Sequence, residues 1–156
     1  IRDRNKNIHF FIIGEFPRII GRSYYKELLG YVSEEARKNI HFTGYISPSL
    51  LNKFYRYSDL FISASYSVAC ALTLPEAASH NLPIISTDVG AARDIFGESI
   101  VYFNVDDYKQ LAREVLDLYP FSKRRYPQLG LYTWDKVCER IVGMYAQIIK
   151  AEAKLN

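Results

Sequence analysis

The sequence predicts an α/β fold, in which a doubly wound, mainly parallel sheet carries helices on both faces. Short β-rich runs alternate with amphipathic helical runs, which is the arrangement of successive βαβ crossovers. The run 9–14 is apolar and ends in glycine, which is typical of a parallel strand buried on both faces. The length of 156 residues fits one domain with one hydrophobic core.

Each expected element is bounded by residues that start or stop regular structure. Strands are expected at 9–14, 40–43, 60–63, 83–86 and 100–103. Helices are expected at 23–38, from Pro48 through Tyr57, at 73–80, at 91–96, from Asp106 or Asp107 to about 119, and at 133–153. Ser47 and Thr133 are suited to capping helices, and Asn81 to a left-handed stop.

The last helix has an apolar stripe at helical spacing, which predicts that this face lies in a core. The stripe consists of Trp134, Val137, Cys138, Ile141, Val142, Tyr145, Ile148 and Ile149.

Composition excludes several classes of protein. Apolar residues make up 49% and charged residues 24% of the chain, which is typical of a globular domain rather than a disordered one. The net charge of +3 is too small to indicate a nucleic-acid partner. The two cysteines do not have the spacing of a zinc site or a disulfide framework. The basic run 122–125 is consistent with an acidic lipid surface, although such a run usually forms a solvated face.

The segment 63–87 is the richest in possible chemistry. A loop of small residues leads into a helix at Thr73, and the N–H groups and dipole of a helix start favour an anion. Ala69 and Ala71 would let a diphosphate approach the backbone. Glu76 lies in the first turn, where its carboxylate could accept hydrogen bonds from a ribose diol. Thr73 and Glu76 also match the T-x-x-E capping box, and the spacing favours both interpretations equally.

The order of several short motifs resembles the retaining glycosyltransferases of family four, which have the GT-B fold. The segment L-x-L-P-E-A-A-S-H-N-L-P-I-I-S-T-D-V-G, from Leu72 to Gly90, is similar to the second half of that family's donor-binding motif. Ile8–Gly14, 40–46, 57–63 and 132–137 resemble further strand and helix motifs, so the resemblance covers about residues 8–150.

The resemblance implies that 1–156 is a single C-terminal, Rossmann-like donor-binding domain, one half of a GT-B fold. Glu76 would bind the ribose hydroxyls, and the backbone near Ala71, Leu72 and Thr73 would hold the diphosphate. Gly44 and Tyr45 would meet the nucleobase, and Gly14 would line the same cleft.

The implied reaction transfers a hexose from a nucleotide sugar to a glycan or lipid-linked acceptor with retention of configuration. It uses no metal and no other cofactor. The implied location is the cytoplasm, either in solution or at the membrane surface.

Two departures from the family pattern are visible. Val68 stands where the family has its first glutamate, which contacts the donor sugar, and Ala69-Cys70-Ala71 replaces a Gly-Phe-Gly loop. The resemblance also implies that a first strand and helix, and the N-terminal acceptor domain, are missing. We therefore expect a chain that is inactive alone, self-associates through exposed apolar surface, and has a final helix that crosses to the absent domain. The alternative is a degenerate, non-catalytic nucleotide-binding or scaffold module.

Overall fold

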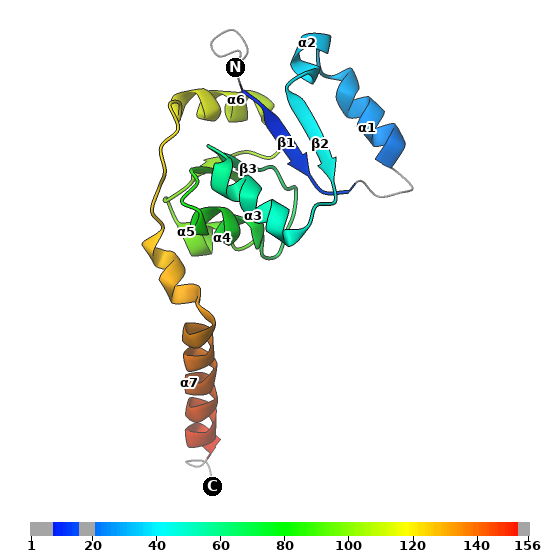
Figure 1. Cartoon of the computed structure of the whole chain (residues 1–156). Coiled ribbons are helices and arrows are strands. Elements are labelled where there is room, and N and C mark those ends of the chain that lie inside the picture. Colours follow the sequence, from blue (N-terminus) through cyan, green and yellow to red (C-terminus); the bar gives the residue numbers. More distant parts are fainter. Residues whose placement is uncertain (1–7, 16–20, 153–156) are drawn as a thin grey trace. The chain divides into compact units, whose positions relative to one another are not determined.

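The computed structural model of the chain describes residues 8–15 and 21–152. It divides into two compact units, Ile1–Tyr57 and Ser58–Asn156. Both units contain parallel sheets accompanied by helices (Figure 1). The predicted Rossmann-like α/β class, with helices on both sides of parallel strands, is confirmed.

The first unit is built on a two-stranded parallel sheet. β1 (Phe10–Ile13) pairs with β2 (Ile40–Gly44), with Phe11 opposite His41. The helices of this unit are α1 (Gly21–Gly30), α2 (Glu34–Arg37) and α3 (Pro48–Tyr57). As predicted, α3 starts at Pro48, and the Leu50 N–H donates to Ser47 Oγ over 3.4 Å.

The continuous helix predicted over 23–38 is wrong, because two helices occupy this segment. α1 ends at Gly30, and α2 begins after Ser33, whose hydroxyl accepts the Ala36 N–H over 3.4 Å. Glycine weakens a helix, and serine competes for backbone donors as a cap. The Arg37 guanidinium donates to the Leu29 carbonyl over 2.8 Å, which satisfies an acceptor at the end of α1.

The second unit contains a three-stranded parallel sheet with the order β3-β4-β5. Its strands are β3 (Phe61–Ser63), β4 (Ile84–Thr87) and β5 (Val101–Phe103). Its helices are α4 (Thr73–Ser79), α5 (Ala92–Phe96), α6 (Tyr108–Asp117), the 3-10 helix η1 (Pro127–Tyr132) and α7 (Trp134–Glu152). The sequence did not predict η1, which lies in a segment expected to be irregular.

The core of the second unit surrounds β4, whose four residues are all buried. β4 is the central strand, so both of its edges are paired, and α4 and α6 also contact it. Leu82 and Phe96 are 0% and 2% exposed beside it. The Tyr126 hydroxyl donates to the Leu82 carbonyl over 2.7 Å, which ties the segment after α6 to this core.

Two predictions of burial are wrong for the described residues. Phe11 in β1 is 49% exposed, so the elements of its own unit do not cover this strand on both faces. The apolar stripe of α7 is also exposed, with Trp134 at 84%. Helical spacing identifies the apolar face of a helix but not the element that covers it. Residue 153 lies outside the described residues, and the crossing to another domain stays a prediction.

Thr133 caps α7 as predicted, since its hydroxyl accepts the Lys136 N–H over 3.4 Å. Despite its apolar stripe, neither α7 nor another helix in the described part of the chain is long and apolar enough to span a bilayer.

Candidate functional site

The loop after β3, residues 64–72, is anchored by the last residue of β4 and by the segments that follow β4 and β5. The Thr87 hydroxyl donates to the Ser65 carbonyl over 2.8 Å. The Ala91 N–H donates to the Ala69 carbonyl over 3.1 Å. The Tyr66 hydroxyl donates to the Asp106 carboxylate beyond β5. All three contacts lie at or just after the carboxyl ends of parallel strands, which is where α/β proteins bind ligands.

Gly90 lies against the carbonyl groups of Val68 and Ala69 in this loop. Its φ is +59°, and a Cβ there would stand 2.0 Å from the Val68 carbonyl oxygen and 2.7 Å from that of Ala69. A side chain at position 90 would therefore push the loop away from its support. The sequence alone does not indicate this role of Gly90, because the role depends on a loop more than 20 residues earlier.

The start of α4 offers fewer backbone donors than a typical helix start. The Leu74 N–H donates to the Ala71 carbonyl over 3.0 Å, and the Glu76 N–H to the Leu72 carbonyl over 3.1 Å. Pro75 has no N–H. An anion at α4 would therefore depend on the N–H groups of Thr73 and the residues just before it.

The capping-box alternative for Thr73 and Glu76 does not fit the observed helix start. Leu72 occupies the N-cap position with αR backbone, and Thr73 is the first helical residue. Glu76 is then the fourth helical residue, whereas a capping box needs its carboxylate at the third. The Glu76 side chain is exposed, while its carbonyl accepts from Ser79 Oγ over 2.7 Å. This placement puts the Glu76 side chain on the surface of the second unit.

Leu72 and Thr73 are exposed, and Ala71 is half-buried. Val68 is also half-buried, and its carbonyl lies against Gly90. The second unit therefore brings Ala71, Leu72 and Thr73 together at the entrance to α4, one turn before Glu76.

The first unit holds the other predicted residues. Gly14 and Gly44 end β1 and β2 with φ of +130° and +65°, and the Gly14 N–H donates to the Gly44 carbonyl over 3.1 Å. Nothing lies within 4 Å of a Cβ built at either position, so backbone conformation rather than space favours glycine. Tyr45 follows them with its side chain 73% exposed. The single cleft expected to join these residues to Glu76 stays a prediction.

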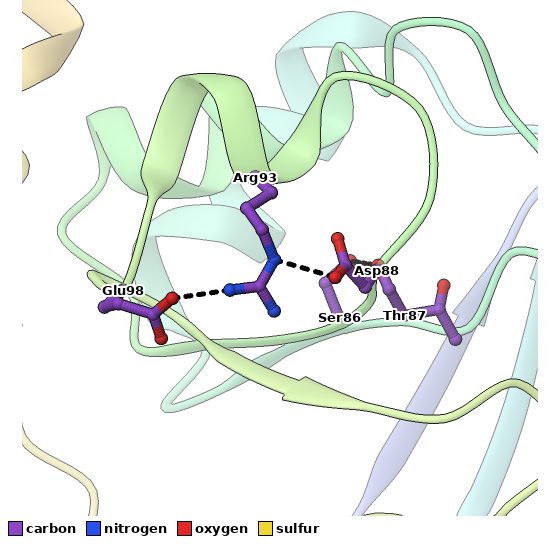
Figure 2. Close-up of polar contacts among 5 residues, drawn as sticks. All are labelled: Ser86, Thr87, Asp88, Arg93 and Glu98. Atoms are coloured by element: carbon purple, nitrogen blue, oxygen red, sulfur yellow. Dashed lines mark hydrogen bonds and ion pairs between the residues drawn. The ribbon is translucent and has the colours of Figure 1, made fainter.

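A charged cluster supports the loop after β4 (Figure 2). Arg93 Nε lies 2.7 Å from the Asp88 carboxylate, and its Nη1 lies 2.5 Å from that of Glu98. The guanidinium also lies over the Tyr102 ring, 4.2 Å from the centroid. Arg93 thus links both ends of α5 to β5 and helps to place Gly90 and Ala91. The five-residue spacing of 88, 93 and 98 was a signal that the sequence analysis missed.

Burial strongly affects the pKa of one residue in this cluster, Tyr102. Desolvation raises the pKa of Tyr102 to about 12, and the nearby Arg93 charge opposes this shift. The buried Tyr102 hydroxyl has no hydrogen-bond partner among the described residues. The hydrogen bond to Asp88 raises the pKa of Arg93, so this side chain stays a cation.

Parallel strands, helices on both sides and loops gathered at the carboxyl edge of the sheet define a Rossmann-like α/β protein. Comparison with protein families makes the assignment specific. Residues 1–120 match the family described as "Glycosyl transferases group 1", and the chain belongs to this family.

Curated relatives and solved structures agree with this assignment. The chain is 35% identical over 69 residues to the alpha-galactosylglucosyldiacylglycerol synthase of Streptococcus pneumoniae, covering 44% of this chain and 17% of the relative. It is 24% identical over 153 residues to the phosphatidylinositol N-acetylglucosaminyltransferase GPI3 subunit of Saccharomyces cerevisiae, covering 92% of this chain and 33% of the relative. The chain thus spans a third or less of these proteins.

The fold is similar to that of two solved glycosyltransferase-related structures. Sucrose-phosphate synthase from Thermosynechococcus elongatus gives a TM-score of 0.71 at 19% identity, covering 90% of this chain and 38% of that one. AviGT4, a glycosyltransferase of avilamycin A biosynthesis, gives 0.62 at 16% identity, covering 91% and 44%. These neighbours support a GT-B glycosyltransferase fold.

Proposed function

We propose that this chain is the C-terminal, nucleotide-sugar-binding domain of a family-four retaining glycosyltransferase. The whole enzyme would transfer a hexose from a nucleotide sugar to a glycan or lipid-linked acceptor. The observation that carries the proposal is the loop 64–72, which is anchored by the loops after β4 and β5 and leads directly into the helix that bears Glu76.

The proposed site holds the diphosphate by backbone donors. Residues 58–118 contain three basic residues, Arg93, Lys109 and Arg113, against nine acidic ones, a net charge of −6. Arg93 is already paired with Asp88 and Glu98. The local field therefore opposes an anion, so cations from elsewhere would be needed for tight binding. In this proposal the isolated chain binds nucleoside diphosphates weakly, with Kd in the millimolar to micromolar range, about −4 to −8 kcal/mol.

Glu76 recognises the ribose in this proposal. Its exposed carboxylate accepts two hydroxyl hydrogen bonds, while Gly44 and Tyr45 contact the base and Gly14 lines the cleft. No metal or other cofactor takes part, since the nucleotide sugar is the substrate. The isolated chain transfers no sugar, because the transition state needs groups from both halves of the enzyme.

The lipid-linked variant of the acceptor is supported by the names of the two curated relatives. One is a diacylglycerol glycolipid synthase, and the other a phosphatidylinositol glycosyltransferase subunit. We propose the cytoplasmic side of a membrane as the corresponding location, with the basic run 122–125 on the chain's surface. Binding to vesicles that contain an anionic lipid, compared with neutral vesicles, tests this location.

Calorimetric titration with several nucleoside diphosphates tests the donor site. Glu76→Gln keeps the size of the side chain but removes its charge, and hydrogen bonds to a charged group contribute about 1.5–3 kcal/mol. The affinity of the variant should fall by about 10- to 100-fold. The matched control is Glu139→Gln, which removes an exposed glutamate from α7 and should leave the affinity unchanged. Equal affinities of wild type and Glu76→Gln would contradict the ribose assignment.

The degenerate scaffold is the second candidate, and Val68 is the observation that favours it. Valine cannot accept the hydrogen bond that the family's first glutamate accepts from the donor sugar. Val68→Glu separates the two candidates. If the site still binds donors, Val68→Glu should raise the affinity for a nucleotide sugar relative to that for the matching nucleoside diphosphate. This ratio of affinities should be higher than in the wild type. A scaffold would bind neither ligand, with or without the substitution.

A further inference from the structure

We propose that His9 and His41 bind a divalent transition-metal ion in the first unit. The His9 Nδ1 and His41 Nε2 atoms lie 3.0 Å apart. The two ring planes differ by 25°, and their centroids are 5.2 Å apart. The rings therefore meet through their nitrogen atoms, and imidazole nitrogen is a preferred ligand of Cu²⁺, Ni²⁺ and Zn²⁺.

The strand register brings the two histidines together. His41 lies opposite Phe11 in the pairing of β1 with β2, and His9 precedes Phe11 by two residues. Side chains two residues apart along an extended chain point to the same face. His9 and His41 are therefore diagonal neighbours on one face, and their contact follows from the backbone pairing.

An aromatic row supports the His41 ring. The Phe11 ring stacks on His41 with centroids 4.8 Å apart and planes at 21°. Phe54 of α3 contacts Phe11 in turn, with centroids 5.2 Å apart. His41 is half-buried in this row, while His9 is exposed. One ligand is thus held in place, and the other is free to turn toward an ion from solvent.

The separation of the two nitrogens fits bidentate coordination. Two Zn–N bonds of about 2.05 Å at a tetrahedral angle put the nitrogens about 3.3 Å apart. A square-planar arrangement at about 2.0 Å puts them about 2.8 Å apart. The observed 3.0 Å lies between these values. Turning each ring by about 35–45° from the line of the hydrogen bond would direct both lone pairs at one ion, and water would complete the coordination.

The proton balance of metal binding is simple. In the free pair, one ring donates an N–H and the other accepts it. When the ion binds, the donating ring moves its proton to its other ring nitrogen, so both facing nitrogens become ligands and no proton is released. Acid would compete with the metal, because a protonated imidazole has no lone pair at the ligating nitrogen.

Within the first unit, this pair lies away from Gly14 of the proposed donor site. His9 precedes β1, whereas Gly14 follows it, so the two positions lie at opposite ends of the same strand. Among the described residues, no group of three or more histidine, cysteine or acidic side chains is gathered as a metal site. The inference rests on the histidine pair and its aromatic support.

Titration calorimetry with NiCl₂ tests the proposal. Cys70 and Cys138 are exposed thiols that would also bind the ion, so the titration uses the full chain with Cys70→Ser and Cys138→Ser. This parent should bind one Ni²⁺ per chain. His9→Gln and His41→Gln should each weaken binding by about tenfold or more, because one ligand of a chelating pair is lost. The matched control is His80→Gln, which removes the third histidine of the chain and should change nothing.

If a histidine variant misfolds, electron paramagnetic resonance of Cu²⁺ bound to the parent chain still tests the proposal. The parent chain should show two nitrogen ligands on the bound copper, and either folded variant should show one. A parent with one nitrogen ligand or none would overturn the proposal. So would a loss of Ni²⁺ affinity in His80→Gln equal to that in His41→Gln.

Discussion

β4 and α7 both carry large apolar side chains, but β4 is buried throughout whereas α7 exposes its apolar face. Ile84 and Ile85 are 1% and 0% exposed, compared with 84% for Trp134 and 65% for Ile149. β4 has a strand on each edge and helices in contact with it, all from its own unit. An apolar segment is therefore buried where its own unit supplies the strands and helices that cover it.

The difference shows where the stability of the second unit resides. Burying a large apolar side chain contributes about 1.5–3 kcal/mol relative to leaving it exposed. The residues around β4 gain this contribution, and those of α7 do not. The exposed stripe of α7 is a further apolar surface through which the chain could self-associate, since large apolar patches on a monomer usually mark a binding partner.

The largest predicted effect comes from truncating the core beside β4. Phe96 is 2% exposed, and its ring meets Tyr126 edge to face. Phe96→Ala should lower the free energy of unfolding by about 3–5 kcal/mol. Trp134→Ala in α7 removes a larger but exposed ring and should cost less than about 0.5 kcal/mol. Urea unfolding measures both values, and a large loss for Trp134→Ala would show that α7 is covered in solution.

A smaller loss is expected at the glycine that supports the loop after β3. Gly90→Ala combines a left-handed backbone with a clash against the Val68 carbonyl and should cost about 2–4 kcal/mol. Gly44 is the control, because its φ is +65° and nothing lies within 4 Å of a Cβ there. Gly44→Ala should cost about 1–2 kcal/mol from conformation alone. Thermal unfolding compares the two, and equal losses would show that the close approach has no energetic weight.

The smallest predicted effect concerns alkaline pH. The folded state holds the pKa of Tyr102 at about 12, above the ordinary value of about 10, so the unfolded chain releases this proton first. The contribution is fully present below pH 10 and is lost as the pH rises toward 12. Tyr102→Phe should reduce this loss of stability. Tyr145→Phe in α7 is the control and should leave the pH dependence unchanged. The free energy of unfolding, measured at several pH values between 9 and 12, tests this prediction.

Local signals predicted most of the secondary structure. The caps at Ser47, Asp107 and Thr133, and the left-handed Asn81, act within one turn of the chain and are confirmed. The break between α1 and α2 was missed because the apolar spacing continues through it. The exposure of α7 could not be predicted, because it depends on which elements cover the helix.

The candidate site was predicted in part. Gly14 and Gly44 end neighbouring strands, and their contact follows from parallel pairing. Gly90 was missed because its role depends on a loop that is distant in sequence, whereas the partners of Arg93 all lie within nine residues of it. The spacing of Thr73 and Glu76 allowed two interpretations, and the backbone at Leu72 distinguished them.

The central claim is that the loop 64–72 and the start of α4 bind a nucleotide. Amide chemical shifts measured during titration with nucleoside diphosphates test it most directly. The largest changes should fall between Val68 and Glu76 and at the supporting Gly90, while the amides of α7 should not move. Changes confined to other segments, or none with any nucleotide at millimolar concentration, would contradict the account.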